Sequence, residues 1–161
     1  MIFAIQIYIM IPYWMSRTEL MLGQENINAL MGKNVLIIGL GGVGGICAEM
    51  IARAGVGKMT IVDNDTIDLS NINRQIPALH STAGASKAQV LGARLKDINP
   101  ELDLTILEIF IKEDLTKELL DSTQWDYVVD CIDTLSAKTF LIKGCIDRNL
   151  PIVSSMGAVE K

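Results

Sequence analysis

Short runs of consecutive apolar residues alternate along the chain with longer segments in which apolar residues recur every three or four positions. The continuous runs are rich in β-branched residues, as is typical of strands buried in a parallel sheet. We predict five such strands, over residues 34–38, 59–63, 102–107, 127–132 and 151–155. The periodic segments predict helices over residues 18–31, 43–54, 86–98, 113–121 and 137–148. This alternation predicts an α/β fold with a doubly wound, mostly parallel, Rossmann-like sheet.

One long segment, residues 64–85, follows neither pattern. It is rich in turn-forming residues and contains at most a short helix. Loops of this length are uncommon inside a compact domain and usually carry function. We therefore expect residues 64–85 to contribute to a binding site.

The N-terminal residues 1–15 read MIFAIQIYIMIPYWM and carry no charge. This stretch is shorter than the roughly 20 residues that a membrane-spanning helix needs, and it lacks the basic region and cleavage site of a signal peptide. We interpret it as an apolar leader of uncertain status. It is either a translation artefact upstream of a start at Met15 or, less favoured, a membrane anchor, and we expect no stable membrane association. Residues 16–161 form the predicted domain, whose first helix is expected to bury Leu20 and Ile27.

The composition limits the class of protein. The 161 residues suffice for one domain with a substantial core, and half of them are hydrophobic, which argues against a disordered chain. A formal net charge of −5 argues against general affinity for nucleic acid. Cys47, Cys131 and Cys145 form no C-x-x-C pair, so we interpret them as small buried residues rather than nucleophiles or zinc ligands. A reducing, cytoplasmic location fits this use of cysteine.

A glycine-rich loop follows the first predicted strand. In the sequence LIIGLGGVGG, Gly39, Gly41 and Gly44 have the spacing G-x-G-x-x-G. Glycines at this spacing allow a tight turn and the close approach of a phosphate to the positive end of a helix. Asp63 ends the next strand, about 20 residues further on, where a carboxylate can accept hydrogen bonds from both ribose hydroxyls. These residues predict a site for an adenine nucleotide, which is either NAD or ATP.

Amide and guanidinium groups after Asp63 favour a triphosphate over NAD. Asp65 follows closely, and the sequence SNINRQ at residues 70–75 includes Asn71 and Arg74. Phosphate oxygens need planar, charge-assisted donors, whereas an NAD enzyme has no particular need of an arginine at this point. The alternative interpretation is an asparagine-rich turn with one solvated arginine.

Lys87 lies at an unfavourable place for a lysine. Ser86 and Gln89 form a capping-box pattern, which places Lys87 in the first turn of the helix over residues 86–98. A positive charge there is repelled by the helix dipole. A phosphate held at the same helix start would make the net electrostatic interaction of the lysine favourable. Lys87 is therefore either a phosphate ligand or an ordinary surface lysine.

Two carboxylates follow the fourth predicted strand. Asp130 and Asp133 lie where ligands bind in open α/β sheets, and one carboxylate beside phosphates commonly holds Mg²⁺. Asp133 alternatively caps the following helix. The single histidine, His80, is expected to lie at the surface, which leaves no candidate acid or base for hydride transfer.

Several segments together resemble a known superfamily. The sequences GLGGVGG, AGVGKMTIVDNDTIDLSNINRQ, SKAQV and DYVVDCIDT resemble the E1-like adenylating enzymes, which include ThiF, MoeB, HesA and the ubiquitin-activating enzymes. Within that superfamily, RTELMLG, NRQIPALHSTAGASK and PIVSSMGA resemble the tRNA threonylcarbamoyladenosine dehydratases more than the activators of sulfur-carrier proteins. The resemblance implies adenylation of a carboxylate by ATP and Mg²⁺, most specifically the cyclisation of N6-threonylcarbamoyladenosine at tRNA position 37. The alternative that it leaves is activation of the C-terminus of a ubiquitin-like sulfur-carrier protein.

The resemblance also implies roles for particular residues. Arg74, Lys87 and Asp133 would be catalytic, with Asp133 holding the metal. Arg17 would reach the triphosphate of the opposite subunit, which implies a homodimer. The residues that would bind the nucleotide are Gly39, Gly41, Gly42, Gly44, Asp63, Asp65, Asn71, Arg74, Gln75 and Lys87.

The chain departs from the family pattern near both ends. Relatives usually have an aromatic residue and a further arginine just before RTEL, where this chain has YWMS. The chain stops at GAVEK, whereas relatives extend beyond a single Rossmann half. We therefore expect residues 16–161 to be the C-terminally incomplete, N-terminal part of a larger E1-like domain. An NAD-dependent oxidoreductase and an inactive nucleotide-binding module stay as alternatives.

Overall fold

The computed structural model describes residues 10–156, and a five-stranded parallel sheet lies at its centre. The strands are β1 (Asn34–Ile38), β2 (Lys58–Val62), β3 (Asp103–Leu107), β4 (Tyr127–Asp130) and β5 (Ile152–Ser154). Their order is β3-β2-β1-β4-β5, and every neighbouring pair is parallel. The sheet order turns back between β1 and β4, so these two strands flank the switch point at which such folds bind ligands. The predicted doubly wound, parallel α/β fold is confirmed.

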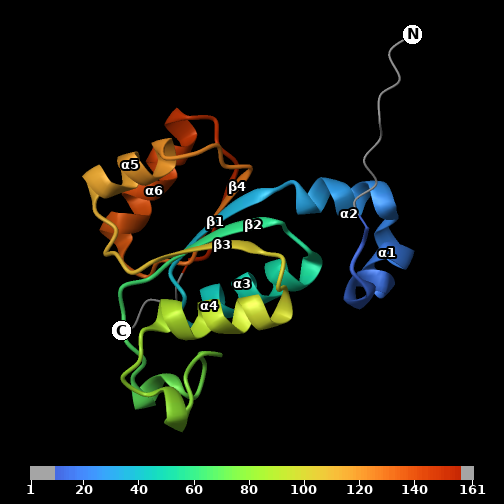
Figure 1. Ribbon diagram of the computed structural model, residues 1–161. Helices are drawn as coiled ribbons and strands as arrows, with labels where there is room; N and C mark the ends of the chain where they lie inside the picture. The colour runs from blue at the N-terminus through green and yellow to red at the C-terminus, as the bar shows by residue number, and fades with distance from the viewer. Residues whose placement is uncertain (1–9, 157–161) are drawn as a thin grey trace.

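Helices cover both faces of this sheet (Figure 1). The helices α3 (Gly42–Ala54) and α4 (Lys87–Ile98) pack on one face, and α5 (Glu113–Asp121) and α6 (Leu135–Asp147) on the other. Right-handed crossovers produce this arrangement, because the chain crosses the sheet in one direction from β1 to β3 and in the opposite direction afterwards.

The two faces of β1 explain its continuous apolar sequence. Ile37 belongs to the core beneath α3 and α4, whereas its neighbour Leu36 belongs to the core beneath α5 and α6. Both side chains are fully buried. Because successive side chains of a strand point to opposite faces, a strand covered on both sides cannot alternate between apolar and polar residues.

The single helix predicted over residues 18–31 is wrong. The structure has two helices here, α1 (Ser16–Leu22) and α2 (Gln24–Met31), separated by Gly23 at φ +78°. This left-handed conformation suits glycine and ends α1. The break also rotates the two apolar faces apart, so Ile27 is fully buried whereas Leu20 is exposed.

Met15 lies in the core, although it was assigned to the leader. It ends a short 3₁₀ turn, η1 (Tyr13–Met15), and its side chain occupies the space that a Cβ on Gly55 would need. Residues 1–9, the larger part of the predicted leader, lie outside the described residues, so the boundary at residue 16 stays a prediction. Within residues 10–156, no helix is long and apolar enough to cross a membrane.

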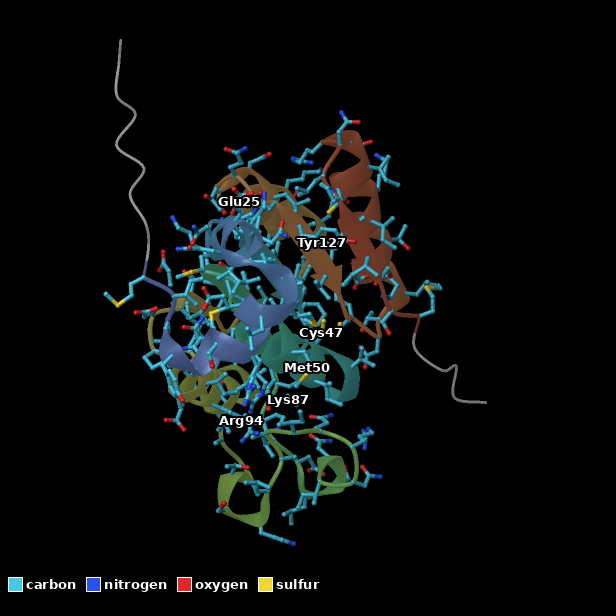
Figure 2. The ribbon with its side chains drawn as sticks, turned by 90° about the vertical axis from the view of Figure 1, so that its right-hand side faces the viewer. Glu25, Cys47, Met50, Lys87, Arg94 and Tyr127 are labelled. Carbon is cyan, nitrogen blue, oxygen red and sulfur yellow. The ribbon has the colours of Figure 1, made fainter. Side chains whose placement is uncertain are left out.

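The long segment between β2 and α4 contains two 3₁₀ turns, η2 (Leu69–Asn71) and η3 (His80–Thr82). A single bridge between Thr66 and Ser86 closes its base. In both views the segment forms a separate lobe beside α4, away from α5 and α6 (Figures 1 and 2). The prediction of a loop with short helical structure is thus confirmed.

Candidate nucleotide-binding site

A cavity of about 480 Å³ opens at the carboxyl ends of the strands. It is lined by the ends of β1 and β2, the glycine-rich loop, the segment after β3 and the loop after β4. Its volume lies within the range of ordinary small-molecule sites. Nine of the residues predicted to bind nucleotide or metal line it, namely Gly39, Gly41, Gly42, Asp63, Asp65, Arg74, Gln75, Lys87 and Asp133.

The glycines bring backbone close to this cavity. Gly39 has φ +87°, and a Cβ there would lie 2.6 Å from the carbonyl oxygen of Cys131. A Cβ on Gly42 would lie 3.3 Å from the carbonyl oxygen of Arg74. Gly41 directly precedes α3, whose N-terminus attracts an anion. Glycine at these positions therefore lets the loop pack closely against the backbone at Cys131 and Arg74, beside the N-terminus of α3.

Gly44 acts through packing instead. It does not line the cavity, and a Cβ there would overlap the carbonyl oxygen of Gly39. Glycine at this position lets α3 begin directly against the loop. The predicted contact of Gly44 with the nucleotide stays a prediction.

Asp63 joins the end of β2 to the glycine-rich loop. One carboxylate oxygen, Oδ2, accepts the backbone N–H of Leu40 at 2.7 Å, and Oδ1 accepts that of Asp65 at 2.8 Å. Each carboxylate oxygen has two lone pairs, so both retain capacity for a ribose hydroxyl. Asp63 lies at the cavity wall, and these two backbone hydrogen bonds fix the position of its carboxylate there.

Lys87 carries a buried charge into the cavity. Its side chain is 7% exposed, and Nζ donates to Oδ2 of Asp65 at 2.8 Å. Ser86 caps the helix as predicted, since its hydroxyl accepts the N–H of Gln89 at 3.4 Å. The interpretation of Lys87 as an ordinary surface lysine is wrong, because its side chain is buried whereas most lysines in proteins are exposed.

Arg74 and Gln75 reach the cavity from the lobe. One guanidinium nitrogen of Arg74 donates to the Ser70 carbonyl at 3.0 Å and to Oδ1 of Asn73 at 2.8 Å, which leaves its other donors available. Gln75 is 8% exposed, and its buried Oε1 has no hydrogen-bond partner among residues 10–156. A buried amide without a partner, at the wall of a cavity, indicates a place for a polar ligand.

Asn71 is not brought to the cavity wall. It is buried in the lobe, where Oδ1 accepts the N–H of Asp68 at 3.1 Å and Asp68 in turn accepts the N–H of Ser70. These bonds form a capping box around η2 and hold the turn that carries Arg74. Its predicted contact with phosphate stays a prediction.

Arg17 lies on α1, which is at the opposite end of the sheet from the cavity (Figure 1). The side chain is exposed. Its position is compatible with the predicted action on another subunit, which stays a prediction.

Asp130, the last residue of β4, and Asp133, in the loop after it, have different surroundings. Asp133 is exposed and lines the cavity. Its alternative role as a helix cap is wrong, because the cap of α6 is Thr134 and no side chain accepts a hydrogen bond there. Asp130 is fully buried beneath the cavity and is paired with Lys138.

The exposed carboxylate of Asp133 suits Mg²⁺ carried by a nucleotide. The described residues include no group of three or more metal-ligating side chains. Mg²⁺ in phosphate sites is typically held by one or two carboxylates together with phosphate oxygens and waters. Asp133 fits that donor set.

The cysteine at the cavity is not an activated nucleophile. Burial raises the pKa of the Cys131 thiol to about 11, and it also raises the pKa of Cys47. The thiolate is the reactive form, so a raised pKa keeps both groups inert near neutral pH. Cys131 follows β4, because the strand stops at Asp130, two residues before the predicted end at residue 132.

Sequence reasoning missed the apolar wall of the cavity. Ile109, Phe110 and Ile111 line it from the segment between β3 and α5, and Phe110 remains half exposed. The available signal was the apolar triplet at residues 109–111, which follows the end of β3 after one residue, Glu108.

A Rossmann-like domain with a glycine-rich loop, an aspartate after β2 and the buried Lys87 at the wall of one cavity is typical of a nucleotide-binding protein. The ThiF family model matches residues 15–160, and the chain belongs to the ThiF family.

Relatives of this chain include two kinds of enzyme. It is 43% identical over 146 residues to the tRNA threonylcarbamoyladenosine dehydratase of Bacillus subtilis, covering 91% of this chain and 57% of the relative. It is 38% identical over 134 residues to the molybdopterin-synthase adenylyltransferase of Escherichia coli, covering 82% and 51%. The chain thus spans between half and three fifths of the length of these relatives.

Solved structures agree in fold. The E. coli tRNA N6-threonylcarbamoyladenosine dehydratase TcdA in complex with ATP superposes with a TM-score of 0.88 at 34% identity, covering 93% of this chain and 63% of that one. The same enzyme in complex with AMP gives a TM-score of 0.88 and covers 93% and 62%.

Proposed function

We propose that this chain is the nucleotide-binding part of an ATP-dependent enzyme that adenylates a carboxylate, with N6-threonylcarbamoyladenosine at position 37 of tRNA as the substrate. The observation that carries this proposal is the buried ammonium group of Lys87 at the wall of a glycine-lined cavity that Arg74 and Asp133 also face. Hydride transfer has no use for this set of charges, whereas reaction at the α-phosphate of ATP does.

The proposed reaction has two steps. The carboxylate of the threonylcarbamoyl group attacks the α-phosphorus of ATP, which forms an acyl-adenylate and expels pyrophosphate. A nucleophile of the same modified base then attacks the acyl carbon, closes a ring and releases AMP. The nucleoside loses one molecule of water overall.

The residues of the cavity have distinct parts in this scheme. Asp63 holds the ribose, and Lys87 and Arg74 stabilise negative charge that develops on the phosphates. Asp133 would hold Mg²⁺, which supplies further charge stabilisation when bound. Gln75, with its unpaired buried Oε1, and the backbone at Gly41 and Gly42 orient the nucleotide.

We further propose a homodimer in which Arg17 of one subunit acts on the triphosphate bound by the other. The position of α1, distant from the cavity of its own chain, supports this arrangement. A cytoplasmic location accompanies the proposed tRNA substrate.

A second candidate is the activation of a ubiquitin-like sulfur-carrier protein. The 38% identity to the E. coli molybdopterin-synthase adenylyltransferase favours it, and the sulfur carrier protein ThiS adenylyltransferase of E. coli is 34% identical over 126 residues. The first chemical step would be the same, with the C-terminal carboxylate of a protein in place of the modified nucleoside.

One assay separates the two candidates. The chain is incubated with ATP, Mg²⁺ and tRNA that carries threonylcarbamoyladenosine, and the nucleosides are then analysed by mass spectrometry, with the B. subtilis dehydratase as positive control. Loss of one water together with AMP formation is expected. An unchanged nucleoside alongside ATP–pyrophosphate exchange driven by a sulfur-carrier protein would replace the first candidate with the second. Binding of NADH without binding of ATP would overturn both.

A further inference from the structure

A buried ion pair lies directly behind one wall of the cavity. Lys138 in α6 is 4% exposed and Asp130 at the end of β4 is fully buried, and their Nζ and Oδ2 atoms lie 2.7 Å apart. Among the ion pairs of residues 10–156, this is the one in which both side chains are nearly inaccessible to solvent. Such a pair is costly to desolvate, and well-packed apolar residues often serve stability as well or better. Its presence therefore calls for an explanation other than stability.

All three N–H donors of Lys138 are used. The three donors of the Lys138 ammonium are directed to Oδ2 of Asp130, to Oγ of Ser154 at 3.0 Å and to the carbonyl of Ser155 at 2.9 Å. Ser154 in turn donates its hydroxyl to Oδ2 of Asp130 at 2.6 Å. The network thus joins α6, β4 and β5 at one point.

The other oxygen of Asp130 controls the loop that follows it. Oδ1 accepts the backbone N–H of Ile132 at 3.0 Å, which fixes the turn of the chain after β4. Ile132 and Asp133 line the cavity, and so does Ser155, whose carbonyl Lys138 holds. The network therefore fixes the backbone N–H of Ile132, the residue directly before Asp133.

We propose that Lys138, acting through Asp130 and Ser154, is a positioning residue that sets the place of Asp133 for Mg²⁺-bound nucleotide. This inference rests on the proposed function, since it presupposes that Asp133 serves a metal–phosphate ligand. Lys138 itself does not line the cavity. Its effect passes through the carboxylate of Asp130 to the backbone of Ile132.

The test uses a double variant, Asp130→Leu with Lys138→Met, because removing one partner alone leaves an unpaired buried charge and because leucine, unlike asparagine, cannot accept the N–H of Ile132. The apparent Mg²⁺ requirement for ATP binding is measured by calorimetric titration at a series of Mg²⁺ concentrations. We expect the half-saturating Mg²⁺ concentration to rise about 10- to 100-fold, which is the usual effect of removing a group that orients a metal ligand. Ser154→Ala keeps the ion pair and should raise the half-saturating Mg²⁺ concentration by a smaller factor.

A second readout needs no nucleotide. Amide hydrogen exchange of Ile132, followed by NMR, should accelerate at least about tenfold in the double variant. A folded double variant with the wild-type Mg²⁺ requirement and unchanged exchange at Ile132 would overturn the inference. Absence of ATP binding by the wild-type chain would instead overturn the proposed function, while the exchange measurement would still test the positioning.

The matched control removes another buried carboxylate that lies away from the cavity. Glu49 in α3 accepts hydrogen bonds from Arg94 at 2.6 Å and from Arg53 at 2.8 Å, and none of the three residues lines the cavity. Glu49→Gln with Arg94→Met should lower stability yet leave the Mg²⁺ requirement at its wild-type value. An equal rise in the control would show that general destabilisation causes the effect and would overturn the inference.

Discussion

The Nζ atom of Lys87 lies 2.8 Å from Oδ2 of Asp65, and the lysine is buried while the aspartate is open to solvent. The pair therefore keeps the positive charge of Lys87 in the cavity wall. Its partner Asp65 can be solvated by water when the pair separates. An incoming phosphate can take over the ammonium group without leaving Asp65 as a buried, unpaired charge. The geometry suits a cation that is held ready for an anionic ligand.

Lys87→Met should weaken ATP binding by at least about tenfold, since hydrogen bonds to charged groups contribute about 1.5–3 kcal/mol. Calorimetric titration measures the change. Lys96→Met removes the same charge from the same helix, where Nζ donates to the carbonyls of Pro100 and Leu102 instead, and should leave the affinity unchanged. Equal affinities of wild type and Lys87→Met would refute the phosphate role.

Asp63→Ala should reduce both ATP affinity and stability. The substitution leaves the N–H of Leu40 without its acceptor, at a cost of about 1–3 kcal/mol in the free energy of unfolding. Asp126→Ala is the matched control, because Asp126 accepts the N–H of Asn34 at the other end of β1. The control should lose stability in urea denaturation but retain ATP affinity, and a parallel loss of affinity in both variants would contradict the assignment.

The glycines of the chain should differ sharply in their tolerance of alanine. Gly39→Ala combines a positive φ with a contact of 2.6 Å to backbone, and should destabilise by about 3 kcal/mol or more. Gly84 has a similar φ of +83° but no atom within 4 Å of its added Cβ, so Gly84→Ala should cost only about 1–2 kcal/mol. Thermal unfolding measures the stability of the two variants, and Gly39→Ala should have the lower melting temperature. Equal melting temperatures would contradict the close packing of Gly39 against Cys131.

The stability of the protein should depend on Glu49 in acid. Hydrogen bonds from Arg94 and, to a lesser extent, Arg53 hold the pKa of Glu49 below its usual value. A depressed pKa in the folded state gives stability that is present above the unfolded pKa of about 4.3 and is lost as the pH falls through the folded value. The difference in urea midpoint between wild type and Glu49→Gln should therefore be largest near neutral pH and shrink below about pH 4. If the difference in urea midpoint grew as the pH fell, the pKa of Glu49 would not be lowered in the folded state.

The fold was predictable because local signals and tertiary packing agree. Three local signals each indicate one element. They are the apolar run of β1, the glycine-rich loop that precedes α3 and the capping Ser86 that begins α4. The break at Gly23 was missed because apolar periodicity continues across it, and only a positive φ reveals that the chain changes direction.

The site was predictable where a motif fixes chemistry and less so where it depends on contacts across the fold. Asp63, Arg74 and Lys87 were identified by residue type and place, and all three line the cavity. The sequence pattern treated Asp130 and Asp133 alike, although Lys138 from the next helix buries one of them and not the other. No local pattern records that pairing, because it forms only when α6 packs against the sheet.

The most direct test of the account is a competition between ATP and NADH for the wild-type chain and for Arg74→Ala, with Arg148→Ala as control. Arg148 pairs with Asp121 away from the cavity. We predict that ATP binds wild type and Arg148→Ala equally, that NADH does not displace it, and that Arg74→Ala binds ATP at least about tenfold more weakly. Tight binding of NADH without ATP, or undiminished affinity of Arg74→Ala for ATP, would contradict the account.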